Sequence, residues 1–319
     1  MDFRKTCSLT ELMETMKKQL ICLALAGTVM APMTAQAVEV ANTGIDFYGS
    51  LRIMLEHAEY ADDTEYKDAS SRIGLKGERD LGEGLKAFAK YEVAVNLDNE
   101  GDSIGDMRYG YLGLSGDWGS FSGGKVSSPF YDAVGYYGDY MWWDSAPVYY
   151  TLDGGSRIGQ SALYESPDLA GLKLKALVQI DDADNGEEGQ HQLGANYSIG
   201  NLTLGAAYTD AANNNDIYGL SASYSGDGFY INGAWMDRED TGSGIDALIG
   251  VPSGKNLYTL GLSSLDDDAG SNDFDAVILA FQRSLHKDVL VWVEAMAWDG
   301  TLYGVEDSNV INVGMNFNF

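Results

Sequence analysis

The chain has few cysteines and few basic side chains. Two of its 319 residues are cysteine, Cys7 and Cys22, and both lie in the first 37 residues. This argues against an exported domain held together by disulfides. Lysine and arginine together number 20 against 48 aspartates and glutamates, a formal net charge of −28. A nucleic-acid-binding protein needs a basic face, so no nucleic-acid partner is expected, and the acidic surface favours cations.

Long hydrophobic runs are also missing. Beyond residue 37 no stretch of 18 apolar residues occurs, which argues against membrane-spanning helices. The apolar run at 20–31 is too short to span a bilayer, and it precedes Ala35-Gln36-Ala37, a small-residue cleavage pattern. We therefore predict a signal peptide at 1–37 and a single domain at 38–319. Acidic residues before Met16 are unusual in a signal peptide, so Met16 is the predicted true start, and mutating its codon should abolish export.

What the chain has instead is strict alternation of apolar and polar residues. Residues 85–95, 172–180, 202–208 and 218–224 each place apolar side chains at every second position. The last ten residues, 310–319, do the same and finish on an aromatic side chain. Successive side chains of a strand point to opposite faces, so each segment is predicted to be an amphipathic strand. Because the alternation continues to the last residue, this final strand is expected to pair with the first strand of a closed barrel.

The connections between these segments alternate between short turns and longer, often acidic loops. Such alternation is required if every strand crosses a membrane. Taking 244–251 as a short strand gives sixteen strands, with 126–155 the longest connection and 299–308 the last long one. The predicted fold is therefore all-β, a 16-stranded antiparallel transmembrane β-barrel. A soluble β-sandwich adhesin on the cell surface is the alternative from another class, because its strands would alternate as well.

The chain resembles the general porins of Gram-negative bacteria over the whole of residues 38–319. The resemblance rests on residues 46–49, 71–78, 108–114 and 118–125, and on Phe319. It implies a multi-pass outer-membrane homotrimer, embedded in lipid and lipopolysaccharide, whose third loop folds inward as a constriction. Residues 126–155 take the place of that loop. In the family the terminal Phe, here Phe319, is recognised by the barrel-assembly machinery.

Alternation also indicates which charges enter the lumen. A charge on the lipid face near the midplane costs ~2–4 kcal/mol, so mid-strand charges are expected to face inward. Arg52, Arg72 and Lys76 follow from this rule, and the resemblance adds Arg108 and supports Arg72. We predict that these four form a basic pore wall, although each could instead pair with a glutamate and stiffen the barrel. Facing them, the constriction loop offers Asp132, Asp139 and Asp144, and opposed charges would set ion preference.

The same loop is rich in aromatic residues, among them Tyr131, Trp142 and Trp143. Their ring faces could stack on sugars, which would make the channel selective for sugars or oligosaccharides. The favoured interpretation is that they pack the loop against the barrel wall or fill contacts between subunits.

Two acid clusters mark the outer loops, at 181–188 and at 266–273. Divalent cations prefer such oxygen ligands. Because the spacing departs from the calcium-loop pattern, no resident cofactor is predicted, and weakly bound Ca²⁺ or Mg²⁺ bridging to lipopolysaccharide remains an alternative. The three histidines are dispersed and form no metal pair. No enzyme is predicted; the expected function is passive diffusion of ions and small hydrophilic solutes, with weak cation preference.

Overall fold

The computed structural model describes residues 38–39, 43–98, 103–143, 145–180, 189–211 and 215–319. The predicted signal peptide, Asp144 and the whole acid cluster at 181–188 lie outside these residues. The strands are β1 (Val38–Glu39), β2 (Ile45–Ala58), β3 (Asp63–Asp68), β4 (Arg72–Gly82), β5 (Leu85–Val95), β6 (Ile104–Gly116), β7 (Gly119–Ser127), β8 (Arg157–Glu165), β9 (Leu172–Gln179), β10 (Gln190–Ile199), β11 (Leu202–Ala211), β12 (Ile217–Gly226), β13 (Phe229–Arg238), β14 (Gly242–Ser253), β15 (Asn256–Asp267), β16 (Phe274–His286), β17 (Val289–Leu302) and β18 (Val305–Asn318). No helix in this part of the chain is both long and apolar enough to cross a membrane.

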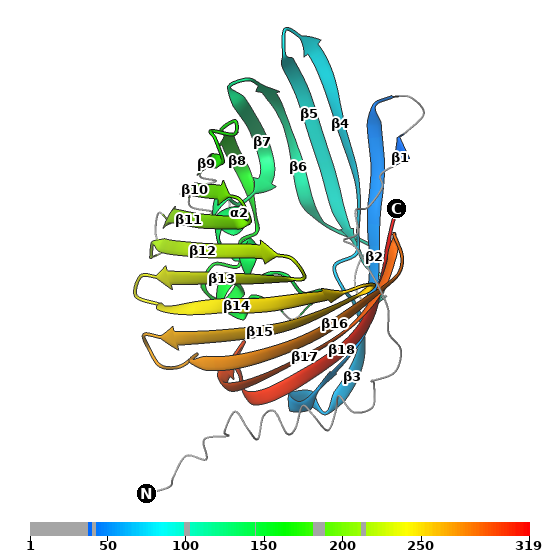
Figure 1. The fold of residues 1–319 in the computed structure, drawn as a ribbon, viewed down its shortest axis with the longest axis vertical. Helices are drawn as coiled ribbons and strands as arrows, with labels where there is room; N and C mark the ends of the chain where they lie inside the picture. Colours follow the sequence, from blue (N-terminus) through cyan, green and yellow to red (C-terminus); the bar gives the residue numbers. More distant parts are fainter. Residues whose placement is uncertain (1–37, 40–42, 99–102, 144, 181–188, 212–214) are drawn as a thin grey trace, which may run out of the picture.

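Sixteen of the described strands, β2 and β4 to β18, form one closed antiparallel barrel (Figure 1). Each strand pairs with the next along the chain, and β18 returns to pair with β2 from Val310↔Ala58 to Asn318↔Ser50. The predicted fold is thus confirmed. Closure leaves no open edge, which is the condition for strands to exist in a bilayer.

Two short strands complete the sheet without adding to the wall. β3 pairs with the Ile53–Ala58 half of β2, while β4 pairs with the Ile45–Ser50 half. The connection between β2 and β4 therefore contains a short strand of its own, which pairs with β2. β1 pairs with Asp46 and Phe47, just beyond the point where Phe319 meets Gly49.

The two faces of the wall differ as alternation predicts. In β12, Tyr218, Leu220 and Tyr224 are exposed, whereas Gly219 and Ser221 between them are buried. The same exposed apolar positions recur around the barrel, from Leu55 on β2 to Val313 on β18. We call this the outer face and the opposite one the inner face. A surface of large apolar side chains open to the surroundings is stable in lipid but not in water.

One predicted connection is wrong, and one predicted strand is longer than expected. Residues 299–308 are not a loop, because β17 and β18 continue to a two-residue turn at Tyr303 and Gly304. Both have positive φ, 52° and 80°, as a tight hairpin turn of the primed type needs. The predicted short strand 244–251 is confirmed as a strand, but it is longer: it is the twelve-residue β14, preceded by the three-residue connection 239–241.

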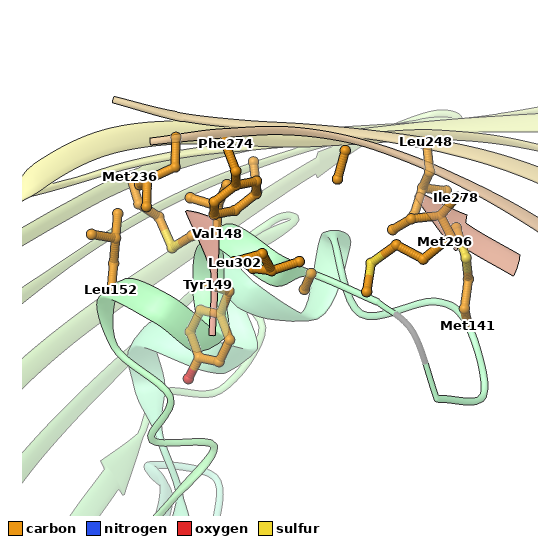
Figure 2. Packing of buried hydrophobic residues seen from close by; sticks show 14 of the residues in the cluster. Met141, Val148, Tyr149, Leu152, Met236, Leu248, Phe274, Ile278, Met296 and Leu302 are labelled. Carbon is orange, nitrogen blue, oxygen red and sulfur yellow. The ribbon is translucent and has the colours of Figure 1, made fainter. Parts of the chain in front are cut away.

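Residues 128–153, the loop segment, contain three short helices: α2 (Pro129–Ala133), η2 (Gly135–Tyr137) and α3 (Pro147–Leu152). They pack against side chains of the inner face. Figure 2 shows Val148, Tyr149 and Leu152 below strands that carry Met236 and Leu248. The main apolar cluster of the protein therefore lies between the loop segment and one side of the wall, chiefly β12 to β18.

Candidate pore-lining site

The start of the loop segment is held by polar side chains of β10 and β12. Ser128 caps α2 by accepting a hydrogen bond from the Tyr131 amide at 3.1 Å, and its hydroxyl donates to Gln192 Oε1 at 2.7 Å. Gln192 is fully buried. At the other end of α2, Ser221 Oγ donates to the Ala133 carbonyl at 2.6 Å. A buried carbonyl oxygen without a partner would cost free energy, so these bonds fix where the helix lies.

Two buried carboxylates hold the rest of the segment. Asp246 on β14 accepts hydrogen bonds from the amides of Val148 and Tyr149, at 3.2 and 3.0 Å. These amides belong to the first turn of α3, which has no side-chain cap of its own, so the carboxylate caps the helix from outside. Glu294 on β17 accepts from the amides of Trp142 and Trp143, at 2.5 and 2.8 Å.

Sequence reasoning missed both carboxylates. Each is a lone acid at an inner-face position of an otherwise apolar stretch, Ile245-Asp246-Ala247 and Val293-Glu294-Ala295. A buried acid of this kind needs several donors, and the described loop amides supply them. That pattern is the one sign in the sequence that could have identified them.

Glycines open a socket for α2 in the wall. A Cβ at Gly194 would lie 2.6 Å from the Pro129 carbonyl oxygen, and one at Gly219 would lie 2.7 Å from the Phe130 ring. At Gly205 the Ala133 carbonyl oxygen would be 2.0 Å away. These strands therefore need glycine because the helix backbone lies directly on them.

One residue of the predicted basic wall, Arg108, binds Glu92, a buried carboxylate on β5. Arg108 Nε donates to Glu92 Oε1 at 2.9 Å, and Tyr48 Oη donates to Oε2 at 2.9 Å. Lys90 lies 3.6 Å from the same oxygen. A β-bulge puts Arg108 here: the pairing steps from Glu92↔Tyr109 to Val93↔Met107, so Arg108 is the extra residue. Simple alternation from Leu112 and Leu114 would have placed Arg108 on the outer face.

The other three predicted wall residues make fewer contacts. Arg52 donates through Nε to Ser50 at 3.0 Å and lies 4.4 Å from the centre of the Trp142 ring. Arg72 donates to the Ser70 carbonyl at 3.2 Å, and Lys76 lies 5.8 Å from the Tyr48 ring. Within the described residues none of the three forms an ion pair with a carboxylate, so the alternative of pairing with glutamate applies to Arg108 but not to these three.

One cation of this wall was not predicted. Arg157, the first residue of β8, lies 5.0 Å from the centre of the Tyr109 ring, and Lys90 lies 3.8 Å from the same ring. Cations are attracted to ring faces, so Tyr109 holds both side chains in place. Arg157 follows the loop directly in sequence, and alternation gives no information there.

The predicted loop acids have different surroundings. Asp132 forms an ion pair with Lys175 on β9 at 2.8 Å. Asp139 accepts hydrogen bonds from Tyr131 at 2.7 Å, Tyr150 at 2.9 Å and Ser145 at 2.5 Å. Asp144 lies outside the described residues. Asp153 ends α3, and burial raises its pKa to about 6 although Arg238 opposes the shift.

The predicted aromatic residues divide between packing and exposure. Trp142 stacks on the buried Trp292 of β17, with ring centres 5.3 Å apart. Tyr131 is held by Asp139, and burial raises the pKa of its phenol, as does that carboxylate. Trp143 is 39% exposed, like Tyr150 on α3. The packing interpretation therefore describes the geometry of Trp142 and Tyr131, whereas the Trp143 ring is exposed.

Phe319 closes the barrel seam. Its amide donates to the Gly49 carbonyl at 3.1 Å and its carbonyl accepts from the Gly49 amide at 2.9 Å. The ring lies 5.5 Å from that of Phe47 and fills the space beside Gly49, where a Cβ would meet it at 2.3 Å.

In the outer acid cluster at 266–273, Asp267 stabilises the turn that follows it. The Asp267 carboxylate accepts hydrogen bonds from the amides of Ser271 and Asn272, at 3.0 and 2.9 Å. Within the described ranges no group of three or more His, Cys, Asp or Glu could hold a metal ion.

Comparison with known proteins gives consistent results. The family model described as Gram-negative porin matches residues 22–300. The major outer membrane protein P.IB of Neisseria meningitidis is 25% identical, over 88% of this chain and 92% of its own length. Outer membrane protein U of Vibrio vulnificus is 32% identical, over 70% of this chain and 69% of its own. A solved structure of OmpT from Vibrio cholerae in a trimer form superimposes with a TM-score of 0.71 at 20% identity, covering 86% of this chain and 99% of that one.

Proposed function

Because the chain belongs to the Gram-negative porin family, an outer-membrane family, we propose that it forms a water-filled channel for passive diffusion of ions and small hydrophilic solutes. The observation that carries this is the pairing of a closed barrel with a charged inner face. Arg52, Arg72 and Lys76 lie on that face, and among the described residues none of them forms an ion pair with a carboxylate. The loop segment packed against the same face narrows the passage.

The direct test is single-channel recording of the purified protein in a planar bilayer. A homotrimer, as in the trimer form of Vibrio cholerae OmpT, should close in three equal steps, and solute flux should rise linearly with concentration. A protein that inserts but conducts no current would contradict the channel function. The further partners we propose are outer-membrane lipid, lipopolysaccharide bridged by Ca²⁺ or Mg²⁺ at the acidic outer loops, and the barrel-assembly machinery.

We propose weak cation preference, set by acids of the loop segment facing the basic wall. Replacing Asp132, Asp139 and Asp144 together by asparagine should move the reversal potential in a KCl gradient toward the anion side. The shift has two sources: three negative charges disappear, and Lys175 loses its partner Asp132. A control variant, D240N/D266N/D268N, removes the same charge from the connection 239–241 and from the end of β15 with the residue that follows it. Equal reversal potentials in the test variant and the control would remove the loop acids from the selectivity filter.

The second candidate is a channel selective for sugars. The observation favouring it is the exposed ring of Trp143, close in sequence to the packed Trp142. If stacking on sugars matters, W143A should abolish block of the current by oligosaccharides, whereas W142A should mainly change open-channel noise, because Trp142 supports Arg52. Unchanged oligosaccharide block in W143A, or no block of the wild type, would leave general diffusion as the function.

A further inference from the structure

The β17–β18 hairpin is bent near its tip, where the pairing of the two strands is irregular. The pairing register shifts between Trp298 and Thr301, where β17 has one residue more than β18. Gly300 lies within this shift and has a φ of 92°. A Cβ on Gly300 would lie 2.1 Å from the Asp273 carbonyl oxygen, and that oxygen accepts from the Thr301 amide at 2.7 Å. Trp298 Nε1 then donates to the Val305 carbonyl at 3.0 Å, which holds the tip over the inner face.

The bend buries one side chain of the tip. Leu302 is 1% exposed and belongs to the same apolar cluster as Val148, Tyr149 and Leu152 of the loop segment. Figure 2 shows it next to Val148 and Tyr149. Val305 also packs against this cluster, but Tyr303 between them is 61% exposed, so burial does not extend to the whole tip.

α3 depends on contacts of this kind. A helix of six residues is not stable by itself in water, so its position must come from its surroundings. Asp246 holds its first turn and Arg238 donates to the Leu152 carbonyl at 2.9 Å. The hairpin covers a further side. Burial and Asp139 raise the pKa of the Tyr150 phenol, and Tyr303 adds to this shift, which agrees with a hairpin tip close to α3.

We propose that residues 301–305, the hairpin tip, act as a clamp that holds α3 against the inner wall. Leu302 is the positioning residue. Passage through the channel would then depend on two segments about 150 residues apart in sequence, the loop segment and the hairpin tip. The proposal rests on the channel function proposed above.

The first experiment uses the absence of cysteine beyond residue 37. Single variants L302C and Y303C of the reconstituted protein are treated with a membrane-impermeant maleimide. We expect Y303C to react rapidly and L302C at least about tenfold more slowly, because local opening is needed to expose it. Equal rates in the folded barrel would overturn the clamp.

The second experiment measures current. L302S should raise open-channel noise about threefold over wild type, because α3 is released, while Y303S and the volume-preserving L302M should not. Persistence of the folded barrel in each variant is checked by its heat-dependent migration in detergent gels. If wild type and L302S conduct with equal noise, the clamp is wrong and the channel stands. If wild type does not conduct, the channel function itself fails, while the labelling result still reports on the clamp.

Discussion

Replacing both Asp246 and Glu294 by alanine is expected to detach the loop segment from the wall and produce large, noisy fluctuations of the open-channel current. Each carboxylate accepts two backbone amides, so four amides, those of Trp142, Trp143, Val148 and Tyr149, lose their partner. A buried donor left without an acceptor costs ~1–3 kcal/mol. The total free-energy cost of the four amides exceeds what the packing of two helical turns and of Trp142 can offset. The loop segment should therefore detach from the inner face.

The barrel should survive this change, because its strand ladders do not involve either side chain. Single-channel recording measures the noise and mean conductance, and thermal unfolding followed by far-UV circular dichroism measures the barrel. The conservative variant D246N/E294Q keeps an amide oxygen at each position and should lie between wild type and the alanine variant.

E56A is the matched control, since Glu56 is another buried inner-face acid but pairs with Lys67 at 2.6 Å and not with the loop segment. If the alanine double variant and E56A showed the same quiet current, the loop segment would be held by apolar packing alone.

Strand positions could be predicted from the sequence because a period of two is a local property. Alternation can be recognised from neighbouring residues alone, and the same is true of short turns between strands. The faces of Arg52, Arg72 and Lys76 follow directly. Local patterning failed at irregularities: the hairpin at Tyr303 was hidden by the polar residues around it, and the bulge at Arg108 reverses the parity of its strand.

The anchors of the loop segment could not be predicted because they join residues far apart in sequence. Glu294 and Trp142 are 152 residues apart, and no spacing rule relates them. The same holds for Gly205. A side chain there would collide with α2, which comes from another part of the chain. The roles of these residues can therefore be recognised only once the barrel is known. The barrel places them on its inner face, and that face determines where the loop segment lies.

Variants at the seam between Phe319 and Gly49 are expected to distinguish two roles of the terminal residue, closure of the barrel and recognition by the assembly machinery. In F319A the backbone bonds with Gly49 remain, so refolding of urea-denatured protein into detergent should change little. If the assembly machinery recognises the terminal aromatic ring, the same variant should lose most of its yield in the outer membrane of cells. In G49L the new side chain displaces the Phe319 ring, and overpacking of this kind costs ~1–3 kcal/mol, so both refolding and cellular yield should fall.

G233L is the matched control for this pair of variants. Gly233 lies in β13, and a Cβ there would meet nothing within 4 Å, so a leucine should be tolerated in both measurements. Refolding is followed by the heat-dependent shift in gel mobility, and cellular yield by outer-membrane fractionation. Equal losses in refolding and in cells for F319A would mean that the ring acts through closure of the barrel. A normal cellular yield of F319A would show that the ring is not needed for recognition.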